Sequence, residues 1–460
     1  MIEIPVPAES VAPKSCKPHV IGALIAAILA GEFPDPPRWQ KICPCCGHIE
    51  FSPFGIDLGP RANSFWIAVQ RVGAVLSGLD EASGEPTVHD VVAAITEDFH
   101  FEQDLHFIYP HLAALAIASL RWDDEFVESV LDTLEPSLAG IADEQDTYQV
   151  MRVIFLTLRG VLLGRDLWEE LSRQGEKIGN EDIASALSSF LMNDEDPKVF
   201  VESSAFRDFT AILEILRSSN SFQEIHDAMT EADGWATNWY GGEKVLLAAL
   251  AGAHFGIHRM PPALTTKVRI DEKLVSSWRV NSDRDGFYNL DQLQDVALTL
   301  AGFKAIRDTE PESTNRKAEV EPGLFAGNLG GATQIDEETV VISLCRTGWR
   351  FDSYSIHRQY YLIDKEGDIN PDLRAVVQDA VDEIDKHLSE GRKVLVHCHG
   401  GRSRTALILK AWKMRRDGVD EEAAHLWLKA NWPDINRKNS TFVDFLKNEW
   451  PHIVKELNRG

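Results

Sequence analysis

The stretch VLVHCHGGRSRTALI, residues 394–408, sets the narrowest limits on what this chain can fold into. A β-rich apolar run leads into it and an apolar, helix-forming run leaves it. We predict a buried strand that ends at Cys398, a tight loop, and a helix that begins at Arg404. Gly400 and Gly401 let the loop backbone curl so that its N–H groups point inward. Such a curl beside a helix N-terminus forms an anion-binding nest.

The two reactive residues at the ends of this loop have complementary chemistry. The positive field of the nest favours the thiolate form of Cys398, which is the nucleophilic form. Arg404 can hold a tetrahedral oxyanion with two parallel hydrogen bonds, which a lysine cannot do. The pair therefore predicts a nucleophile beside its substrate clamp. A buried cysteine in a glycine-rich turn is the alternative, and it accounts for neither Arg404 nor the flanking strand and helix.

The overall composition makes this basic loop an exception. The 460 residues contain 72 Asp and Glu against 46 Lys and Arg, which gives a formal charge of −26. A field of that sign repels polyanions, so we expect no nucleic-acid partner, although a small anion can bind where positive charge is concentrated locally. Six cysteines in a chain of this length indicate reduced, cytoplasmic thiols rather than a disulfide scaffold.

The sequence predicts neither a secretory signal nor membrane insertion. Its first residues lack the basic-then-apolar order of a signal peptide. The longest apolar stretch, residues 20–31, is shorter than the about 20 residues that span a bilayer. We therefore expect a cytoplasmic protein.

Hydrophobic patterning divides the chain into two parts. Apolar runs at helical spacing fill residues 20–265, which is typical of a helix bundle. Residues 306–317 are polar and proline-containing, as in a linker, and we place the boundary near residue 315. Beyond it, short β-rich runs alternate with helical runs, which indicates α/β architecture with a mainly parallel sheet and helices on both faces. We predict a larger all-α domain over residues 1–305 and an α/β domain over 318–460.

Three strands and one helix of the α/β part can be placed from the sequence. The predicted strands are residues 340–345, 360–363 and 394–398. A helix is predicted after Asn370-Pro371, because apolar residues recur at three- and four-residue steps from Leu373 to Leu388. Pro371 suits its first turn, and Gly391 stands just past its end.

The pattern His-Cys-x5-Arg-Thr resembles the signature of cysteine-dependent phosphatases, in particular the dual-specificity branch. Residues 323–329, 340–345 and 439–446 resemble that family's opening strand, next core strand and closing helix, so the resemblance covers residues 318 to 455. It implies that Cys398 attacks phosphorus, that Arg404 holds the phosphate, and that the Thr405 hydroxyl aids departure of the thiolate. It implies no cofactor. A rhodanese-like sulfur carrier would also cradle a thiolate, but it does not require the closing arginine or the hydroxyl after it.

The same resemblance assigns the rest of the phosphate-binding loop. These residues are His399, Gly400, Gly401, Arg402 and Ser403. The basic side chains of His399 and Arg402 resemble those of phosphoinositide phosphatases, which act on heavily anionic substrates; the alternative is that both point to solvent. We expect a phosphorylated protein or an anionic small molecule as substrate, hydrolysed through a cysteinyl-phosphate intermediate.

The family also needs a general acid, an aspartate on a separate loop that follows a strand. Two residues fit. Asp364 directly follows an apolar run, whereas Asp368 better matches the spacing to the helix after Pro371. The sequence leaves the choice between them open.

Residues 241–262 resemble the C-terminal metal-site helix of ADP-ribosylglycohydrolases. Alanines and glycines fall in register, but Glu243 and Val245 stand at the positions of the two ligand aspartates. No carboxylate remains at the corresponding earlier motif near Ala62 and Asn63. Because a dimetal site needs several carboxylate oxygens, we predict a degenerate domain, a scaffold or a ligand-sensing module. An ADP-ribose-type ligand is suggested by analogy alone.

Three cysteines and one histidine lie close together near the start of the chain. These residues, Cys43, Cys45, Cys46 and His48, are spaced too tightly for a single tetrahedral zinc site, so we predict unpaired thiols and no metal site.

Two functions other than phosphate-ester hydrolysis remain as alternatives. The chain could be a metal-dependent ADP-ribosyl hydrolase acting through its N-terminal domain. It could also be a binding protein that recognises phosphate without turnover.

Overall fold

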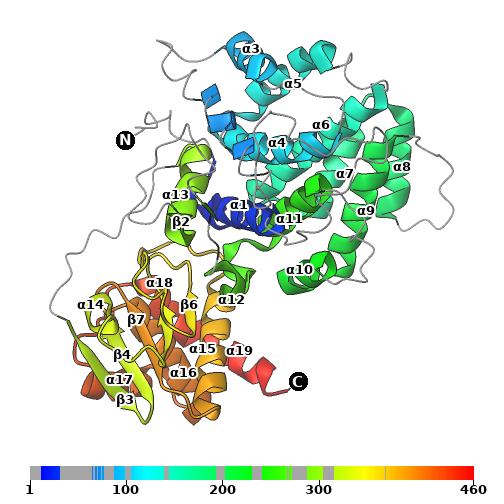
Figure 1. The fold of residues 1–460 in the computed structure, drawn as a ribbon. Helices are drawn as coiled ribbons and strands as arrows, with labels where there is room; N and C mark the ends of the chain where they lie inside the picture. Colours follow the sequence, from blue (N-terminus) through cyan, green and yellow to red (C-terminus); the bar gives the residue numbers. More distant parts are fainter. Residues whose placement is uncertain are drawn as a thin grey trace. The chain divides into compact units, whose positions relative to one another are not determined.

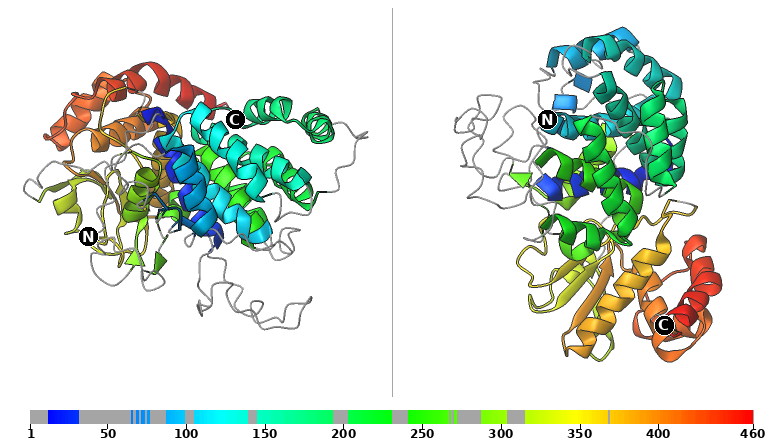
Figure 2. Two further views of the ribbon diagram at one scale, coloured as in Figure 1. Left: turned by 90° about the horizontal axis from the view of Figure 1, so that it is seen from above. Right: turned by 90° about the vertical axis from the view of Figure 1, so that its right-hand side faces the viewer.

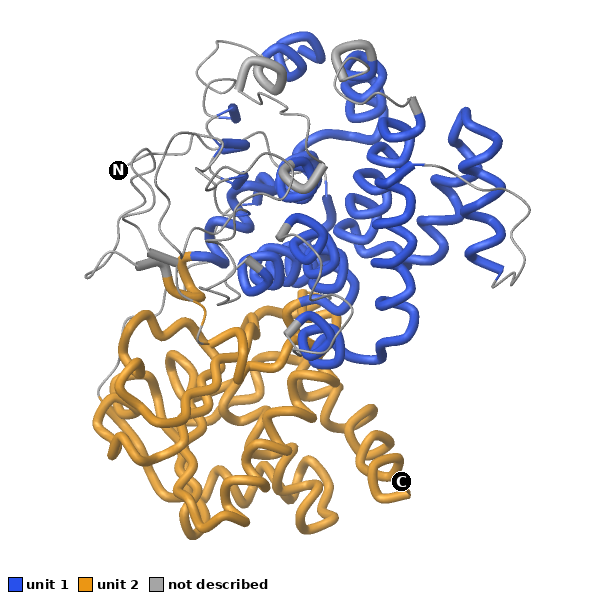
Figure 3. The backbone as a smooth tube through the Cα atoms, turned by 45° about the vertical axis from the view of Figure 1, so that its right-hand side comes forward, with its two compact units in different colours: residues 1–256, 269–288, 293–305 blue, residues 257–268, 289–292, 306–460 orange. Residues whose placement is uncertain are grey.

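The computed structural model describes residues 12–31, 65, 68–69, 71–73, 75–76, 87–98, 105–138, 145–192, 203–230, 241–266, 268, 270–271, 287–303, 315–367 and 369–459. The chain forms two compact units, drawn in blue and orange in Figure 3. Unit 1 comprises Met1–Gly256, Arg269–Tyr288 and Leu293–Ala305, and unit 2 comprises Ile257–Val268, Asn289–Gln292 and Ile306–Gly460. Two short segments that precede the predicted linker thus cluster with the C-terminal unit. Of the linker itself, residues 306–314 lie outside the described residues.

Unit 1 is helical, and two of its helices, α1 (Lys17–Gly31) and α11 (Gly241–Phe255), pack against each other (Figure 1). Small and aliphatic residues recur on every side of both helices, so most of their side chains are buried. At the contact, a Cβ on Gly252 would lie 2.2 Å from the carbonyl oxygen of Gly22. The absence of a side chain is therefore what lets these two backbones approach.

The remaining elements of unit 1 follow the predicted helical patterning, with one difference. An antiparallel pair of two-residue strands, β1 (Ile270–Asp271) and β2 (Phe287–Tyr288), departs from the all-α prediction. The helices are α3 (Val88–Asp98), α4 (Leu105–Ala118), η2 (Ser119–Arg121), α5 (Asp124–Leu138), α6 (Gln145–Leu162), α7 (Leu167–Lys177), α8 (Glu181–Leu191), α9 (Ser204–Ser218), α10 (Phe222–Thr230) and α13 (Leu290–Leu300). A short turn, η1 (Lys14–Cys16), precedes α1, and the first turn of α13 belongs to unit 2.

The described ranges contain neither a membrane-spanning helix nor a metal-binding cluster. None of their helices combines the length and the apolar character needed to cross a bilayer. Over the same residues, no three His, Cys, Asp or Glu side chains are grouped so as to hold a metal ion. The cysteine cluster at 43–48 and the positions Ala62 and Asn63 lie outside the described residues. Glu243 and Val245 are both buried on α11.

A five-stranded sheet forms the centre of unit 2. In spatial order its strands are β3 (Lys317–Glu321), β4 (Leu324–Asn328), β7 (Val394–Cys398), β5 (Val340–Ser343) and β6 (His357–Gln359). The β3–β4 pair is antiparallel and the other three pairs are parallel, so the sheet is mixed but mainly parallel. All residues of β7 are buried because it is the middle strand and both its faces are covered.

The long helices of unit 2 gather on one face of this sheet (Figure 2). They are α15 (Leu373–Ser389), α16 (Arg404–Asp417), α17 (Glu421–Asn431), α18 (Ser440–Asp444) with the π-helical turn Phe445–Glu449, and α19 (Trp450–Leu457). The second face is covered by the four-residue α14 (Leu329–Ala332) and by Phe351 and Tyr354 from a loop. The prediction of helices on both faces is therefore only partly correct, because the helix packed on the second face is, among the described residues, the four-residue α14. The segments η4 (Ile257–Arg259) and α12 (Pro262–Thr265) contact α15 and β6.

The second predicted strand and the start of the predicted helix differ from the structure. Residues 360–363 were expected to form a strand, but β6 ends at Gln359, and Asn370 instead bonds both backbone groups of Ile363 at 2.9 and 2.8 Å. Pro371 does not occupy the first turn of α15. The helix begins at Leu373 and is capped by Asp372, whose carboxylate accepts the N–H of Ala375.

Candidate active site

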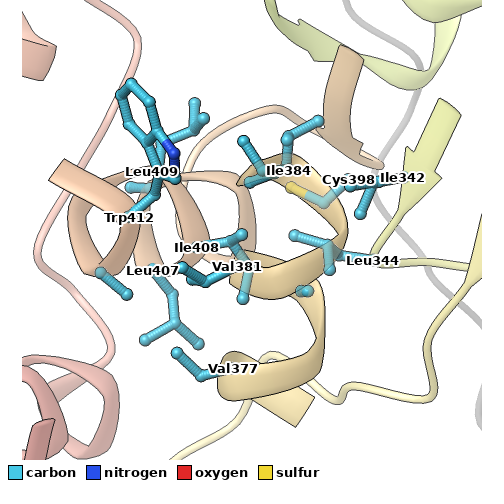
Figure 4. Close-up of a cluster of buried hydrophobic side chains, with 14 of the residues drawn as sticks. Ile342, Leu344, Val377, Val381, Ile384, Cys398, Leu407, Ile408, Leu409 and Trp412 are labelled. Carbon is cyan, nitrogen blue, oxygen red and sulfur yellow. The ribbon is translucent and has the colours of Figure 1, made fainter. Parts of the chain in front are cut away.

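Cys398 is the last residue of β7, at the carboxyl edge of the sheet, as the sequence predicts. Its side chain is 2% exposed and belongs to the core cluster between the sheet and α15 and α16. Figure 4 shows it beside Ile342 of the neighbouring strand β5, beside Leu344 just after that strand, and near Ile384 of α15. Catalytic groups of open parallel sheets commonly lie at this edge, where the strands end and the loops begin.

The loop after Cys398 is fixed against β4, α14 and Trp432, the residue that follows α17. Gly401 has a φ of +68°, and a Cβ there would lie 2.8 Å from the carbonyl oxygen of Gly327 and 3.0 Å from the ring of Trp432. The indole N–H of Trp432 donates to the carbonyl of Gly401 at 2.7 Å, and the N–H of Leu329 donates to the carbonyl of His399 at 3.1 Å. Only glycine satisfies both the left-handed backbone and the close approach at residue 401.

Arg404 begins α16 and is 5% exposed, so its guanidinium is held inside the domain. Its Nη1 donates to the backbone carbonyls of Leu344 at 2.9 Å and Leu362 at 3.2 Å. Both carbonyls lie just beyond the carboxyl ends of parallel strands, and the N–H of Leu344 donates to the carbonyl of His397, next to the cysteine, at 2.9 Å. The structure therefore brings Cys398 and Arg404 to one edge of the sheet.

The other predicted loop residues differ in exposure. His399 and Gly400 are half-buried, Arg402 is exposed, and Ser403 is buried without a side-chain bond that caps α16. Thr405 is fully buried, and its hydroxyl has no hydrogen-bond partner within the part of the chain that the structure describes. The structure thus does not place the Thr405 hydroxyl in a hydrogen bond with Cys398.

A partly buried polar chain lies behind the site. His397 Nε2 lies 2.6 Å from Ser343 Oγ, which lies 2.9 Å from His357 Nε2, and the ring of Phe351 contacts both imidazoles. Burial lowers the pKa of His397 to about 3, and the positive charges of Arg404 and Arg350 add to this effect. His397 is therefore a neutral imidazole at physiological pH.

This low pKa predicts an acid-sensitive fold. In the unfolded chain a histidine has a pKa of 6.5, so its neutral burial stabilises the fold above pH 6.5, and that contribution is lost as the pH falls toward 3. As the pH falls below 6.5, we expect the free energy of unfolding of the wild type to decrease. His397 should account for about 1.4 kcal/mol of that decrease per pH unit. His397→Gln should remove that contribution, as measured by denaturant unfolding between pH 6.5 and 5. The exposed His89→Gln is the control, and equal slopes for wild type and His397→Gln would contradict the assignment.

The loop that carries the candidate general acids is braced by the start of α18. Asp364 is exposed, and its carboxylate accepts the side-chain N–H of Asn439 at 3.0 Å. Gly367 N–H donates to Thr441 Oγ1 at 3.0 Å, and Glu366 accepts from both the N–H and the hydroxyl of Ser440. Asp368 lies outside the described residues.

Asn439 is a site residue that the sequence predicts only as the beginning of a helix. Its carbonyl oxygen caps α18 by accepting the N–H of Phe442, which is what the Asn-x-x-Phe pattern signals. Its amide group points the other way and donates to Asp364. That second contact joins residues 75 positions apart, and no local pattern encodes it.

Comparisons with known proteins agree with this geometry in the C-terminal part of the chain. Residues 337–449 match the family described as "Dual specificity phosphatase, catalytic domain". Dual specificity protein phosphatase 1 of Arabidopsis thaliana is 25% identical over 160 residues, which cover 33% of this chain and 75% of that protein. These matches support a cysteine-dependent phosphatase domain in unit 2.

Several solved phosphatase structures are also similar to this part of the chain. Human DUSP28 is 21% identical, with a TM-score of 0.27, over 33% of this chain and 100% of that one. A mouse putative dual specificity phosphatase, solved with zinc tungstate, is 22% identical, with a TM-score of 0.28, over 33% and 95%. PTPMT1 in complex with PI(5)P is 18% identical, with a TM-score of 0.26, over 31% and 98%.

Proposed function

We propose that unit 2 hydrolyses phosphomonoesters through a cysteinyl-phosphate intermediate on Cys398. The observation that carries this proposal is the meeting of Cys398 and Arg404 at one sheet edge, where the guanidinium is anchored by the carbonyls of Leu344 and Leu362. A nucleophile and a fixed planar cation on either side of a glycine-containing loop suit the transfer of a phosphoryl group.

The proposed reaction has two steps. The thiolate of Cys398 attacks phosphorus, the bond from phosphorus to the ester oxygen breaks, and an aspartic acid protonates the leaving oxygen. Water then attacks the phosphorus of the intermediate, loses its proton to the same aspartate, and releases phosphate with the thiolate restored. Arg404 and the loop N–H groups would stabilise the oxyanion of each transition state. The Thr405 hydroxyl would assist the thiolate as it leaves.

We propose Asp364 as the general acid, on the contacts that hold its loop. The amide of Asn439 holds its carboxylate, and the segment around it is bonded to Ser440 and Thr441. A general acid that is held in place at rest needs little reorganisation during the reaction.

A comparison of leaving groups separates the two acids. We expect Asp364→Asn to lower kcat about 10²- to 10³-fold for phosphotyrosine or an alkyl phosphate, because their leaving oxygens need a proton. With an aryl phosphate whose phenol is strongly acidic, the same variant should lose little. Asp368→Asn should behave like the wild type with both substrates. If activity with the poor leaving groups is lost in Asp368→Asn alone, the role of general acid belongs to Asp368. If a variant loses activity equally with both kinds of leaving group, the residue it replaces is not the general acid.

The substrate class is tested by a turnover screen in which phosphate release is measured. Phosphopeptides, phosphoinositides and ADP-ribose phosphates span the proposed substrates, a phosphorylated protein or a multi-anionic small molecule. The partial exposure of His399 and the exposure of Arg402 leave both side chains accessible to a second anionic group. Release from none of these substrates, with tight binding of an oxyanion, would favour a phosphate-recognising protein without turnover.

The N-terminal resemblance leads to a separate proposal. An ADP-ribose-type ligand for unit 1, and a cytoplasmic location for the whole protein, rest on the sequence alone. Hydrolysis of an ADP-ribosyl bond that needs a divalent cation and persists in Cys398→Ser would favour the ADP-ribosyl hydrolase instead.

A further inference from the structure

Unit 2 contains a buried carboxylate that comes from outside the family match. Asp291 lies in the first turn of α13, well before residue 337, and is 8% exposed. Asn289 fixes this turn, because its side-chain oxygen accepts the N–H groups of Asp291 and Gln292 at 3.0 and 3.2 Å. The carboxylate therefore projects from a capped helix start.

The hydrogen-bond partners of the Asp291 carboxylate belong to strand β6 and to the loop that follows β5. One oxygen accepts the backbone N–H groups of Thr347 at 2.9 Å and Gly348 at 2.7 Å. The other oxygen accepts the side-chain N–H of Gln359 at 2.5 Å. The side-chain oxygen of Gln359, Oε1, in turn accepts the Thr347 hydroxyl at 2.6 Å. Asp291, Thr347 and Gln359 thus form a closed, buried ring of hydrogen bonds, called here the acid ring.

The acid ring holds the loop Leu344–Gly348, which connects β5 to the segment leading to β6. The first residue of this loop supplies the carbonyl that accepts Arg404 Nη1 at 2.9 Å. Gly348 has a φ of +60°, and the guanidinium of Arg350 bonds the carbonyl of Thr347 at 3.0 Å. The loop therefore has one fixed end at the acid ring and the other at Arg404.

We propose that Asp291, acting through the acid ring, is a positioning residue for Arg404 and so for the phosphate clamp. The inference rests on the proposed function, since it assigns Arg404 the clamp role. An isolated buried carboxylate would be costly, whereas this one satisfies two backbone N–H groups and an amide at once. Burial raises the pKa of Asp291, and the N–H of Gly348 and the charge of Arg346 oppose that rise. The hydrogen bonds to the loop are thus what keeps the carboxylate in this place.

Two substitutions separate the hydrogen bonds from the charge. Asp291→Ala removes every acceptor that the loop uses. Asp291→Asn keeps one oxygen for the two N–H groups, and the Gln359 amide can turn so that its oxygen accepts from Asn and its NH₂ donates to the Thr347 hydroxyl. We therefore expect Asp291→Ala to be impaired and Asp291→Asn to remain close to the wild type.

The test measures the binding of tungstate, a phosphate-like oxyanion, to the full chain by calorimetry, together with kcat and KM for an aryl phosphate. Asp291→Ala should raise the Kd for tungstate and the KM about tenfold, at a temperature where circular dichroism shows it folded. Ile453→Ala, a buried truncation in α19 of the same unit, is the control for general loosening and should bind tungstate as the wild type does. Wild-type affinity in folded Asp291→Ala, or equal loss in Ile453→Ala, would overturn the proposal.

A second variant covers the case in which Asp291→Ala does not fold. Thr347→Val removes one bond of the acid ring and keeps the side-chain volume, and we expect it to weaken tungstate binding about threefold. An unchanged affinity in that variant would then overturn the proposal. Tungstate binding needs the clamp but no turnover. A wild type that binds tungstate and hydrolyses nothing would therefore refute the proposed function. The positioning role would still be decided by tungstate binding in the variants. A wild type that does not bind tungstate refutes the clamp and with it the role of Asp291.

Discussion

Cys398→Ser should abolish phosphomonoester turnover, with a loss on the order of 10⁴-fold or more, while the protein stays folded and still binds an oxyanion. The serine hydroxyl occupies nearly the same volume but is not ionised at neutral pH, so the variant keeps the packing at the end of β7 and loses the nucleophile. Phosphate release and tungstate binding, measured on the same preparation, separate these two effects.

Cys16→Ser is the matched control for this variant. Cys16 is also a buried free cysteine, but burial raises the pKa of its thiol to about 11, which keeps it protonated and inert. We expect Cys16→Ser to retain full turnover and iodoacetamide to modify Cys398 in preference to Cys16 at neutral pH. Turnover that survives in Cys398→Ser would remove this residue from the mechanism.

Arg404→Lys should lower kcat/KM about 10³-fold, which corresponds to about 4 kcal/mol of transition-state stabilisation. Lysine keeps the positive charge but replaces the planar fork with a single ammonium group. It cannot bond the carbonyls of Leu344 and Leu362 and also present two parallel donors to a phosphoryl group. The loss should appear both in kcat and in the affinity for tungstate.

The same substitution at the far end of the same helix is the control. Arg416 is exposed in the last turn of α16 and lies 3.7 Å from a carboxylate oxygen of Glu321. Because exposed ion pairs of this kind contribute less than about 1 kcal/mol, Arg416→Lys should leave stability and turnover nearly unchanged. If Arg404→Lys were as active as Arg416→Lys, charge alone would be sufficient at residue 404 and the clamp geometry would be refuted.

Local sequence patterns predicted the centre of unit 2 well. The run 394–398 forms β7 with the predicted bounds, and Arg404 begins α16 as expected. Strand β5 and helix α15 also lie where apolar periodicity placed them, although α15 begins two residues after Pro371. These features depend on neighbouring residues, since apolar spacing and a left-handed glycine act within a few positions of the chain.

Patterns failed where a contact from outside the patterned run decided the local structure. Residues 360–363 have the composition of a strand, yet Asn370 occupies the backbone groups of Ile363. The all-α prediction for the N-terminal part missed the short pair of β1 and β2, because two residues are too few to show a period. In both cases the partner lies outside the short run of residues whose pattern was used.

The sequence by itself determined the reactive loop, a cysteine and an arginine separated by five residues with glycines between them, because that chemistry is local. Only the tertiary structure decided what surrounds the loop: Leu344 and Leu362 on Arg404, Asn439 on Asp364, and Asp291 beneath the neighbouring loop. Parallel strands bring their carboxyl ends to one edge whatever their separation in the chain. The partners of the site are therefore set by sheet order and helix docking, which no run of neighbouring residues encodes.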